Sequence, residues 1–347
     1  MKNDLLEKII KEFEEDFTEY NIFIIANTHN IFSETKKWNY EHASIDEFFS
    51  RQEFAEIASA IFNVFGFVKV FYSETEFIEF VINNTIDRDK TIIYNLARDG
   101  VKEGKKSLIP AFCDLFGFKY TGSNAFVISL LRNKFIFSSY LKEFNIPIPQ
   151  SYIFDRQIGF GSKLPGYGKK IVKCVNESAS IGMTDNNIIN ISSNNYCMKE
   201  LLEISTSMNT DKLLVQDYIE GNECEVLVFN NKSDYFALDP VMLKINGSSI
   251  ITSDISNSYD YEFCLLSEIH SDDVCQNIKK CSESASRLLN IETYARFDFR
   301  VTTNGEFFLI DIAGTPYSIK HSSINYIFKE YGFNYQDIYK VVVQLSK

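Results

Sequence analysis

Two short apolar segments near the end of the chain, residues 295–299 and 309–313, are separated by a turn at Asn304-Gly305. An Asn-Gly pair between two apolar runs predicts a β-hairpin, because these residues readily adopt the positive φ angles of tight hairpin turns. Each predicted strand carries one aspartate, Asp298 or Asp311. The hairpin therefore predicts two carboxylates side by side on paired strands.

Two carboxylates held close together repel each other unless a positive charge lies between them. Such oxygen ligands suit Mg²⁺, or Mn²⁺ in its place, and Mg²⁺ commonly bridges carboxylates to substrate phosphates. Arg296 precedes Asp298 by two positions and shares its strand face, so that its guanidinium could stabilise a phosphate there. The alternative is an ordinary ion pair between Arg296 and Asp298, and the hairpin alone favours that alternative.

The charge balance argues against nucleic acid as a partner. The chain has 347 residues, and its 35 lysines and arginines face 47 aspartates and glutamates, which gives a net charge of −12. No basic run stands out, whereas nucleic-acid binders need several cations to neutralise phosphates. An acidic protein can still bind ATP through a few local lysines and arginines. The length predicts two or three domains.

The sequence also predicts a cytoplasmic protein that does not span a membrane. No segment approaches the ~18 consecutive apolar residues that a membrane helix needs. The acidic, amphipathic residues 1–17 are typical of neither a signal peptide nor a transit peptide. The seven cysteines are scattered and contain no Cys-x-x-Cys pair, which is typical of reduced thiols.

Apolar and amphipathic segments alternate over the first part of the chain. The predicted strands are residues 21–27, 67–72 and 91–95, and the predicted helices are residues 50–65 and 73–84. This rhythm is typical of an open parallel sheet with helices on both faces. Further along, the sequence predicts one helix over 124–144, an exposed polar stretch over 185–198 and a long polar loop over 246–262.

Charged and small residues follow one another in a distinctive order from about Asn95 to Ser323. The motifs are Tyr120-Thr121-Gly122-Ser123, Lys134, Ile171-Val172-Lys173, residues 177–182, residues 215–225, Tyr259-Asp260-Tyr261-Glu262, Arg296 with Asp298, Asp311, and His321-Ser322. Their order resembles the D-alanine–D-alanine ligase branch of the ATP-grasp superfamily. The resemblance implies an α/β protein, α+β in its ATP-grasp part, with three domains. These are an N-terminal open parallel-sheet domain (1–122), a central ATP-grasp subdomain (123–212) and a C-terminal subdomain with the metal and substrate site (213–347).

The resemblance also implies a role for each matching residue. The implied ATP contacts are Lys134 and Lys173 to the phosphates, Gln216, Asp217, Tyr218 and Ile219 to adenine, and Glu223 to the ribose. The implied metal ligands are Asp298 and Asp311, and the implied catalytic residues are Arg296, Lys173 and Ser180. The implied substrate residues are Tyr317, His321 and Ser322.

Each of these residues also has an ordinary structural interpretation. Lys134 could be a surface helix lysine, and Glu223 a solvated charge at a strand end. Ser322 could be a helix N-cap, which local sequence favours equally. Lys173 is the stronger functional candidate, because a lysine within an apolar strand needs an anionic partner.

The sequence departs from the family pattern around the expected substrates. Asp311 stands where the family usually has Glu, and Ala313 where it has Asn; both changes would weaken one metal position. Tyr317 replaces a glycine. Further replacements are Cys264 and Leu265 for a lysine and a tyrosine, and Ala179 for a serine. The first amino acid is therefore not expected to bind as D-alanine does.

The resulting prediction is an ATP-dependent carboxylate–amine ligase that joins amino-acid or peptide substrates through an acyl phosphate. A D-alanine–D-alanine ligase of cell-wall synthesis is one alternative, and a non-catalytic ATP-binding protein on a degenerate ATP-grasp frame is another. The expected cofactors are ATP and Mg²⁺. The expected partners are small molecules, with a homodimer left open and with neither nucleic acid nor membrane involved.

Overall fold

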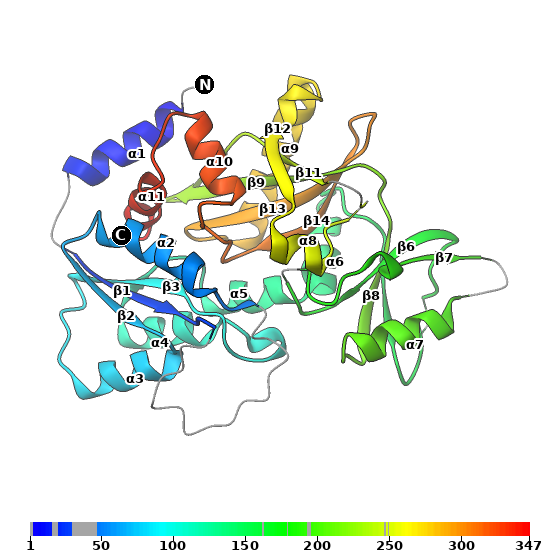
Figure 1. Cartoon of the computed structure of the whole chain (residues 1–347), viewed down its shortest axis with the longest axis horizontal. Coiled ribbons are helices and arrows are strands. Elements are labelled where there is room, and N and C mark those ends of the chain that lie inside the picture. The colour runs from blue at the N-terminus through cyan, green and yellow to red at the C-terminus, as the bar shows by residue number, and fades with distance from the viewer. Residues whose placement is uncertain are drawn as a thin grey trace.

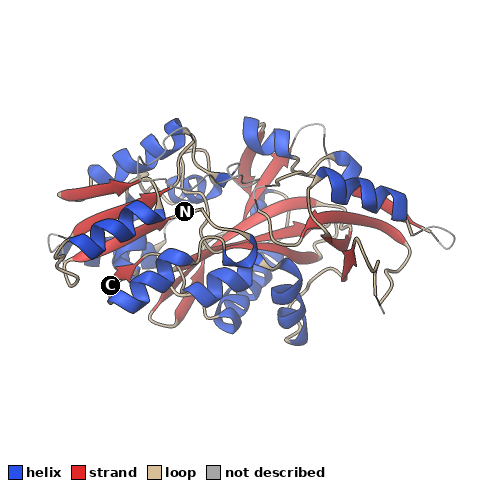
Figure 2. Cartoon of the chain, turned by 90° about the horizontal axis from the view of Figure 1, so that it is seen from below, coloured by secondary structure: helices blue, strands red, loops and turns tan. Residues whose placement is uncertain are grey.

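The computed structural model describes residues 3–15, 20–29, 47–161, 163–178, 180–192, 196–245, 248 and 250–347. Their strands form three sheets, which follow one another along the long axis of the molecule (Figure 1). Helices lie on both sides of the strand layers (Figure 2). This mixed α/β architecture confirms the predicted fold class, while the domain boundaries remain predictions.

The N-terminal sheet is the predicted parallel one. Its strands are β1 (Asn21–Ala26), β2 (Phe67–Phe71), β3 (Thr91–Leu96) and β4 (Lys119–Tyr120), in the order β2-β1-β3-β4. The helices of this part are α1 (Asp4–Glu15), α2 (Arg51–Phe62), α3 (Glu74–Asn83), the short 3₁₀ helix η2 (Lys102–Gly104) and α4 (Leu108–Phe116). Ser50 and Glu53 form a capping box that starts α2, because each side chain bonds the backbone N–H of the other.

The helix predicted over 124–144 is in fact two helices. They are α5 (Ala125–Arg132) and α6 (Lys134–Glu143), and Asn133 between them has the extended angles φ −103° and ψ 93°. The Asn133 side chain accepts a hydrogen bond from the Ile136 N–H at 3.0 Å, so that it caps α6. Lys134 therefore lies at the start of a helix, and it is buried.

The second sheet is antiparallel. It contains β5 (Ser151–Asp155), β6 (Gly168–Cys174), β7 (Ile188–Ile191) and β8 (Lys212–Asp217) in the order β5-β8-β6-β7, with the 3₁₀ helix η3 (Asp185–Asn187) and the helix α7 (Met198–Ser207). The prediction of an exposed polar stretch over 185–198 is wrong for β7. Ile189 and Ile191 are buried and Asn190 between them is exposed, as expected for a strand with one face on a core.

The third sheet is also antiparallel and carries the predicted hairpin. Its strands are β9 (Asn222–Asn231), β10 (Asp234–Ala237), β11 (Val241–Ile245), β12 (Tyr261–Leu265), β13 (Tyr294–Val301) and β14 (Phe307–Ala313), in the order β12-β11-β9-β13-β14 with β10 beside β9. Its helices are α8 (Ser253–Ser258), the 3₁₀ helix η4 (Leu266–Glu268), α9 (Asp272–Leu289), α10 (Ser323–Glu330) and α11 (Asp337–Leu345). The loop predicted over 246–262 thus contains α8 and the start of β12, and its residues 246–247 and 249 lie outside the described residues.

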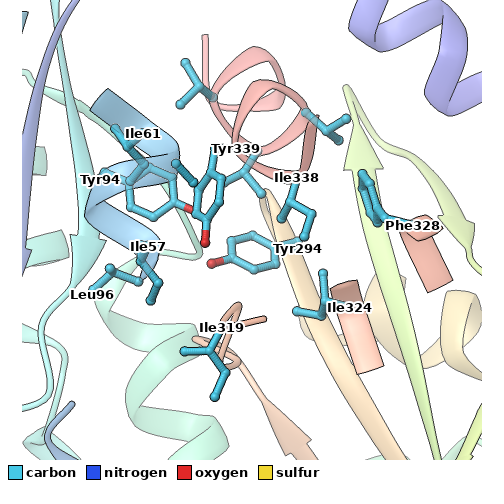
Figure 3. Packing of buried hydrophobic residues seen from close by; sticks show 14 of the residues in the cluster. Ile57, Ile61, Tyr94, Leu96, Tyr294, Ile319, Ile324, Phe328, Ile338 and Tyr339 are labelled. Carbon is cyan, nitrogen blue, oxygen red and sulfur yellow. The ribbon is translucent and has the colours of Figure 1, made fainter. Parts of the chain in front are cut away.

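One hydrophobic core joins the two ends of the chain. Tyr94 from β3, Tyr294 from β13 and Tyr339 from α11 converge in it (Figure 3), and the rings of Tyr94 and Tyr339 lie 5.7 Å apart. The Tyr339 hydroxyl donates a hydrogen bond to the carbonyl of Ser318 at 2.8 Å. Because this core packs the N-terminal sheet against the third sheet, it fixes the two walls of the cavity described next.

Candidate active site

A cavity of about 440 Å³ lies where the three sheets meet, a volume typical of small-molecule sites. All the predicted site residues line it, although their roles remain predictions. They are Lys134, Lys173, Ser180, Gln216, Asp217, Tyr218, Ile219, Glu223, Arg296, Asp298, Asp311, Tyr317, His321 and Ser322.

The two aspartates of the hairpin are paired across strands as predicted. Asp298 on β13 lies opposite Asp311 on β14, with a β-bulge immediately after Asp298. Nε and Nη2 of Arg296 donate to the two oxygens of Asp298, each at 2.8 Å. Nζ of Lys134 donates to Oδ2 of Asp311. The ion pair considered as an alternative thus exists, within a cluster of two carboxylates and two cations.

A third carboxylate belongs to this cluster, and the sequence analysis missed it. Glu225 on β9 lies opposite Asp298, and its Oε1 is 3.2 Å from Nη2 of Arg296. Burial raises the pKa of Glu225 to about 7, although Arg296 opposes that shift. Burial also raises the pKa of Asp298, and the charge of Asp311 acts in the same direction. The sequence signal was the spacing of Glu223 and Glu225, which places both on one strand face.

The donor set fits a hard cation such as Mg²⁺. Asp298 and Asp311 supply only oxygen atoms, from adjacent positions of paired strands. Among the described residues, no group of three or more His, Cys, Asp or Glu side chains is arranged to hold a metal ion. An ion held here would therefore complete its shell with water and phosphate oxygens, as Mg²⁺ commonly does.

Lys173 on β6 is a cation without a carboxylate at ion-pair distance among the described residues. Its Nζ is 3.5 Å from Oε1 of Gln216, and Nε2 of Gln216 donates to Oγ of Ser151 at 3.0 Å. Burial lowers the pKa of Lys173 to about 8, and the charge of Lys134 contributes. A partly buried lysine that lacks a counter-charge among the described residues is suited to bind an anionic ligand.

The other residues expected at the nucleotide have protein partners. Asp217 accepts from Nζ of Lys170 at 2.6 Å. Glu223 lies 3.5 Å from Nη1 of Arg300, and burial raises the pKa of Glu223. Arg300 also lies over the ring of Tyr218, 5.7 Å from its centroid.

Two loops close over the cavity and touch each other. Oγ of Ser253 on α8 donates to the carbonyl of Ser180 at 2.6 Å, and the Ser253 N–H donates to the carbonyl of Met183 at 3.0 Å. The Tyr259 hydroxyl, at the end of α8, donates to Glu53 of α2. Ala179 lies outside the described residues. The loop around Ser180 and the segment from Ser253 to Tyr259 are thus held together over the site.

The residues expected at the substrates also line the cavity. The His321 ring packs against Tyr259, Tyr261 and Phe263 at 5.1, 5.1 and 5.3 Å, and burial lowers its pKa. Oγ of Ser322 accepts from the Asn325 N–H at 3.3 Å. Ser322 is therefore the N-cap of α10, the structural role that its sequence also predicted.

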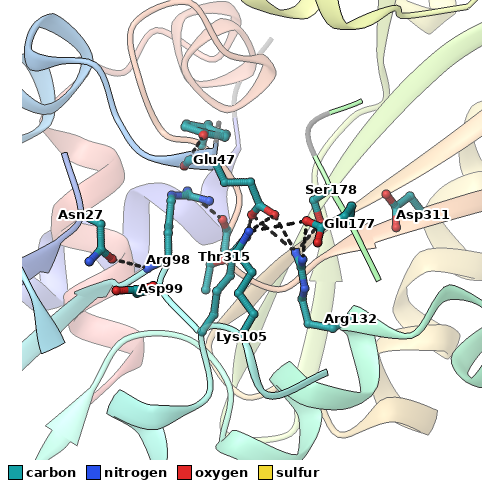
Figure 4. Close-up of polar contacts among 12 residues, drawn as sticks. Asn27, Glu47, Arg98, Asp99, Lys105, Arg132, Glu177, Ser178, Asp311 and Thr315 are labelled. Atoms are coloured by element: carbon teal, nitrogen blue, oxygen red, sulfur yellow. Dashed lines mark hydrogen bonds and ion pairs between the residues drawn. The ribbon is translucent and has the colours of Figure 1, made fainter. Parts of the chain in front are cut away.

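Tyr317 connects the cavity to a buried basic cluster that the sequence analysis missed. The Tyr317 hydroxyl donates to the backbone carbonyl of Glu47 at 2.7 Å. The Glu47 carboxylate is fully buried among Lys105, Lys106 and Arg132 (Figure 4). The adjacent lysines at 105 and 106 were the available signal, but only the fold brings them to Glu47.

Comparison with known proteins identifies relatives of this chain. A family model described as D-ala D-ala ligase C-terminus matches residues 166–344. The D-alanine–D-alanine ligase of Aquifex aeolicus is 22% identical over 252 residues, which cover 69% of this chain and 78% of that protein. That of Fusobacterium nucleatum is 24% identical over 265 residues, covering 75% and 82%.

Two solved structures resemble the whole fold. The ATP complex of the D-alanine–D-alanine ligase from Bacillus anthracis superposes with a TM-score of 0.65 at 15% identity, covering 94% of this chain and 97% of that one. The ligase from Coxiella burnetii gives a TM-score of 0.65 at 14% identity, covering 94% and 95%. The fold is therefore that of the ATP-grasp ligases, enzymes that form carbon–nitrogen bonds.

The chain belongs to the D-ala D-ala ligase C-terminus family, whose model matches more than half of its length. This membership confirms the family predicted from the order of the motifs. No helix among the described residues is long and apolar enough to cross a membrane.

Proposed function

We propose that the protein is an ATP-dependent ligase that joins the carboxylate of one amino-acid or peptide substrate to the amine of another. The observation that carries this proposal is the convergence of Lys134, Lys173 and Arg296 with the Asp298–Asp311 pair in one cavity. Cations and paired carboxylates together are what phosphoryl transfer from a nucleotide requires.

The proposed reaction has two steps. An oxygen of the substrate carboxylate attacks the γ-phosphorus of ATP, the bond to the β-phosphate oxygen breaks, and ADP leaves. The amine nitrogen of the second substrate then attacks the acyl carbon and loses a proton, and phosphate leaves with the bonding electrons. ATP is required because a carboxylate does not react with amines, whereas phosphate is a good leaving group.

The protein's own residues position the reactants and neutralise charge. Lys134 and Lys173 would contact the phosphates, and the backbone of residues 216–219 with Glu223 would hold the nucleoside. Mg²⁺ bound by Asp298 and Asp311 would supply neutralisation of the transferring phosphoryl group. Arg296 would stabilise the negative charge that develops there.

The closed loops would protect the intermediate. The hydrogen bonds from Ser253 to the Ser180 and Met183 carbonyls hold the two loops over the cavity. A closed site excludes water, which would otherwise hydrolyse the acyl phosphate.

A cell-wall D-alanine–D-alanine ligase is the second candidate, and the names of the similar proteins favour it. The bulk of Tyr317 favours different substrates, because this residue lines the cavity. The product decides between the two candidates.

The test is ADP release by the purified protein with Mg·ATP and pooled L- and D-amino acids, followed by mass spectrometry. Amino-acid-dependent ADP together with a product mass of two substrates minus water would support the proposal and name the substrates. ATP binding without turnover across the pool would instead favour a non-catalytic nucleotide-binding protein.

A further inference from the structure

The Glu47 carboxylate is the centre of a buried cluster that the proposed reaction does not use. Its Oε1 accepts from Nζ of Lys105 at 2.7 Å and from Nη1 of Arg132 at 3.1 Å. Nζ of Lys106 pairs with Oε2. Nη2 of Arg132 donates to Glu177 at 3.2 Å (Figure 4). Three cations therefore share Glu47, with Glu177 as a second, partly exposed carboxylate.

Arg98 adds a fourth buried cation. Its side chain stacks on the rings of Tyr317 and Phe49, at 4.1 and 4.5 Å from the centroids, and Nη2 donates to the Thr315 carbonyl at 3.2 Å. Within the described residues it has no carboxylate at ion-pair distance, and its Nε has no hydrogen-bond partner although the residue is only 2% exposed. Nε of Arg132 is also buried and has no hydrogen-bond partner among the residues that the structure describes.

Four cations thus face two carboxylates in a place with little access to water. Burying a charge without a compensating partner is costly. Burial lowers the pKa of Lys106 to about 7, and the charges of Arg98 and Arg132 act in the same direction, against the opposing effect of Glu47. An anionic ligand would relieve this surplus of positive charge.

The surplus faces the cavity, next to the reacting groups. Arg98, Lys106 and Arg132 all line it. Arg132 ends α5, two positions before Lys134, which pairs with Asp311. Arg98 bonds Thr315, which follows Asp311 by four positions. A ligand could therefore reach both the Asp311 end and the basic cluster.

We propose that the acid substrate of this ligase is a dicarboxylic amino acid, whose second carboxylate binds to Arg98, Lys106 and Arg132. This inference rests on the proposed ligase function. The carboxylate nearer Asp311 and Lys134 is the one phosphorylated. The second carboxylate forms no bond in the reaction, and its ion pairs hold the substrate in position.

The first test compares matched substrates. The protein is given Mg·ATP, a pool of amine substrates, and as acid substrate aspartate, glutamate, asparagine, glutamine or alanine, each as L and D isomer. We expect kcat/KM for ADP release to be at least about tenfold higher for a dicarboxylate than for its amide, since a charged hydrogen-bonded contact is lost. Equal values for acid and amide, or a preference for alanine, would overturn the proposal.

A binding test separates this proposal from the ligase function. Without ATP, saturating aspartate or glutamate should raise the melting temperature by about 2 °C, because a ligand of the native state stabilises it, and the amides should not. ADP release without preference for a dicarboxylate would leave the ligase standing and remove this inference. Stabilisation by a dicarboxylate without ADP release from any acid would contradict the ligase function, and the basic cluster would then be a carboxylate-binding site without the proposed substrate role. If neither ADP release nor stabilisation is observed, both the ligase function and the dicarboxylate proposal are contradicted.

Variants locate the second carboxylate. Arg98→Gln should raise KM for the dicarboxylate about tenfold with little change in kcat, whereas KM for the amide should stay the same. Arg98→Lys should restore part of the affinity. Lys102→Gln removes an exposed lysine at the start of the nearby 3₁₀ helix η2 and serves as the control. Lys106→Gln replaces Arg98→Gln if the latter does not fold, and an unchanged KM in a folded variant would overturn the proposal.

Discussion

Asp298 lies directly opposite Asp311 across the β13–β14 ladder. Arg296 of the same strand binds Asp298, and Lys134 at the start of α6 binds Asp311. These two carboxylates and two cations balance one another in charge, and Glu225 lies beside Arg296 as the third carboxylate of the cluster. A divalent cation and the phosphates of ATP would bring further charges of both signs, so that the cluster could rearrange around them at little electrostatic cost.

Asp298→Asn should abolish nearly all turnover. Asparagine keeps the shape of the side chain but loses the charge that would hold the metal, and we expect a loss of about 10³-fold in kcat, as for other groups that stabilise developing charge. ADP release measures the effect, and circular dichroism checks the fold. The exposed Asp234 on β10 provides the control variant Asp234→Asn. Full activity of Asp298→Asn would refute the metal assignment.

The hairpin was predictable because the Asn-Gly turn between two apolar runs is a local signal. The exact pairing of the aspartates was not, because the turn pairs Val301 with Phe307 and the β-bulge after Asp298 then shifts the register to Asp311. The parallel sheet was predictable from the alternation of apolar strand segments with amphipathic helix segments, which is also a local pattern. Glu47 was not predictable, because its partner Lys105 is 58 positions away and only the fold joins them. Similarly, the break at Asn133 depends on a cap within a segment that otherwise has a helical pattern.

Lys173→Met should weaken ATP binding by about tenfold, since a charged contact to phosphate is lost. The pKa of about 8 adds a pH dependence. Below pH 8 the lysine is charged, and above it the free protein must take up a proton to bind the anion, so that ATP affinity should fall as pH rises past 8. Titration calorimetry measures both effects. Lys169→Met, an exposed lysine of the same strand, is the control, and equal affinity in Lys173→Met would contradict the phosphate contact.

Ser253→Ala should uncouple ATP use from amide formation. The variant loses the hydrogen bond to the Ser180 carbonyl, and the loops would open more often and admit water. We expect the ratio of ADP to amide product to rise about threefold, in line with the loss of one neutral hydrogen bond. Ser258→Ala, on the exposed side of α8, removes only a bond within that helix and should leave the ratio unchanged. A ratio near one in Ser253→Ala would show that the loops close without this bond.

Glu47→Gln should destabilise the protein by about 3 kcal/mol at pH 7, because Lys105 and its neighbours keep their buried charges without a counter-charge. The flanking lysines and Arg132 hold the pKa of Glu47 well below its usual range despite its burial. A carboxyl group whose pKa is lowered on folding contributes stability above its unfolded pKa of about 4.3, and that contribution is lost as pH falls towards the folded value.

The difference in the free energy of urea unfolding between wild type and Glu47→Gln should therefore be full at pH 7 and shrink below pH 4. The exposed Glu79→Gln on α3 should match wild type throughout. A pH-independent difference would mean that the loss comes from altered packing around the side chain, since Glu47 is the one titrating group that the substitution removes.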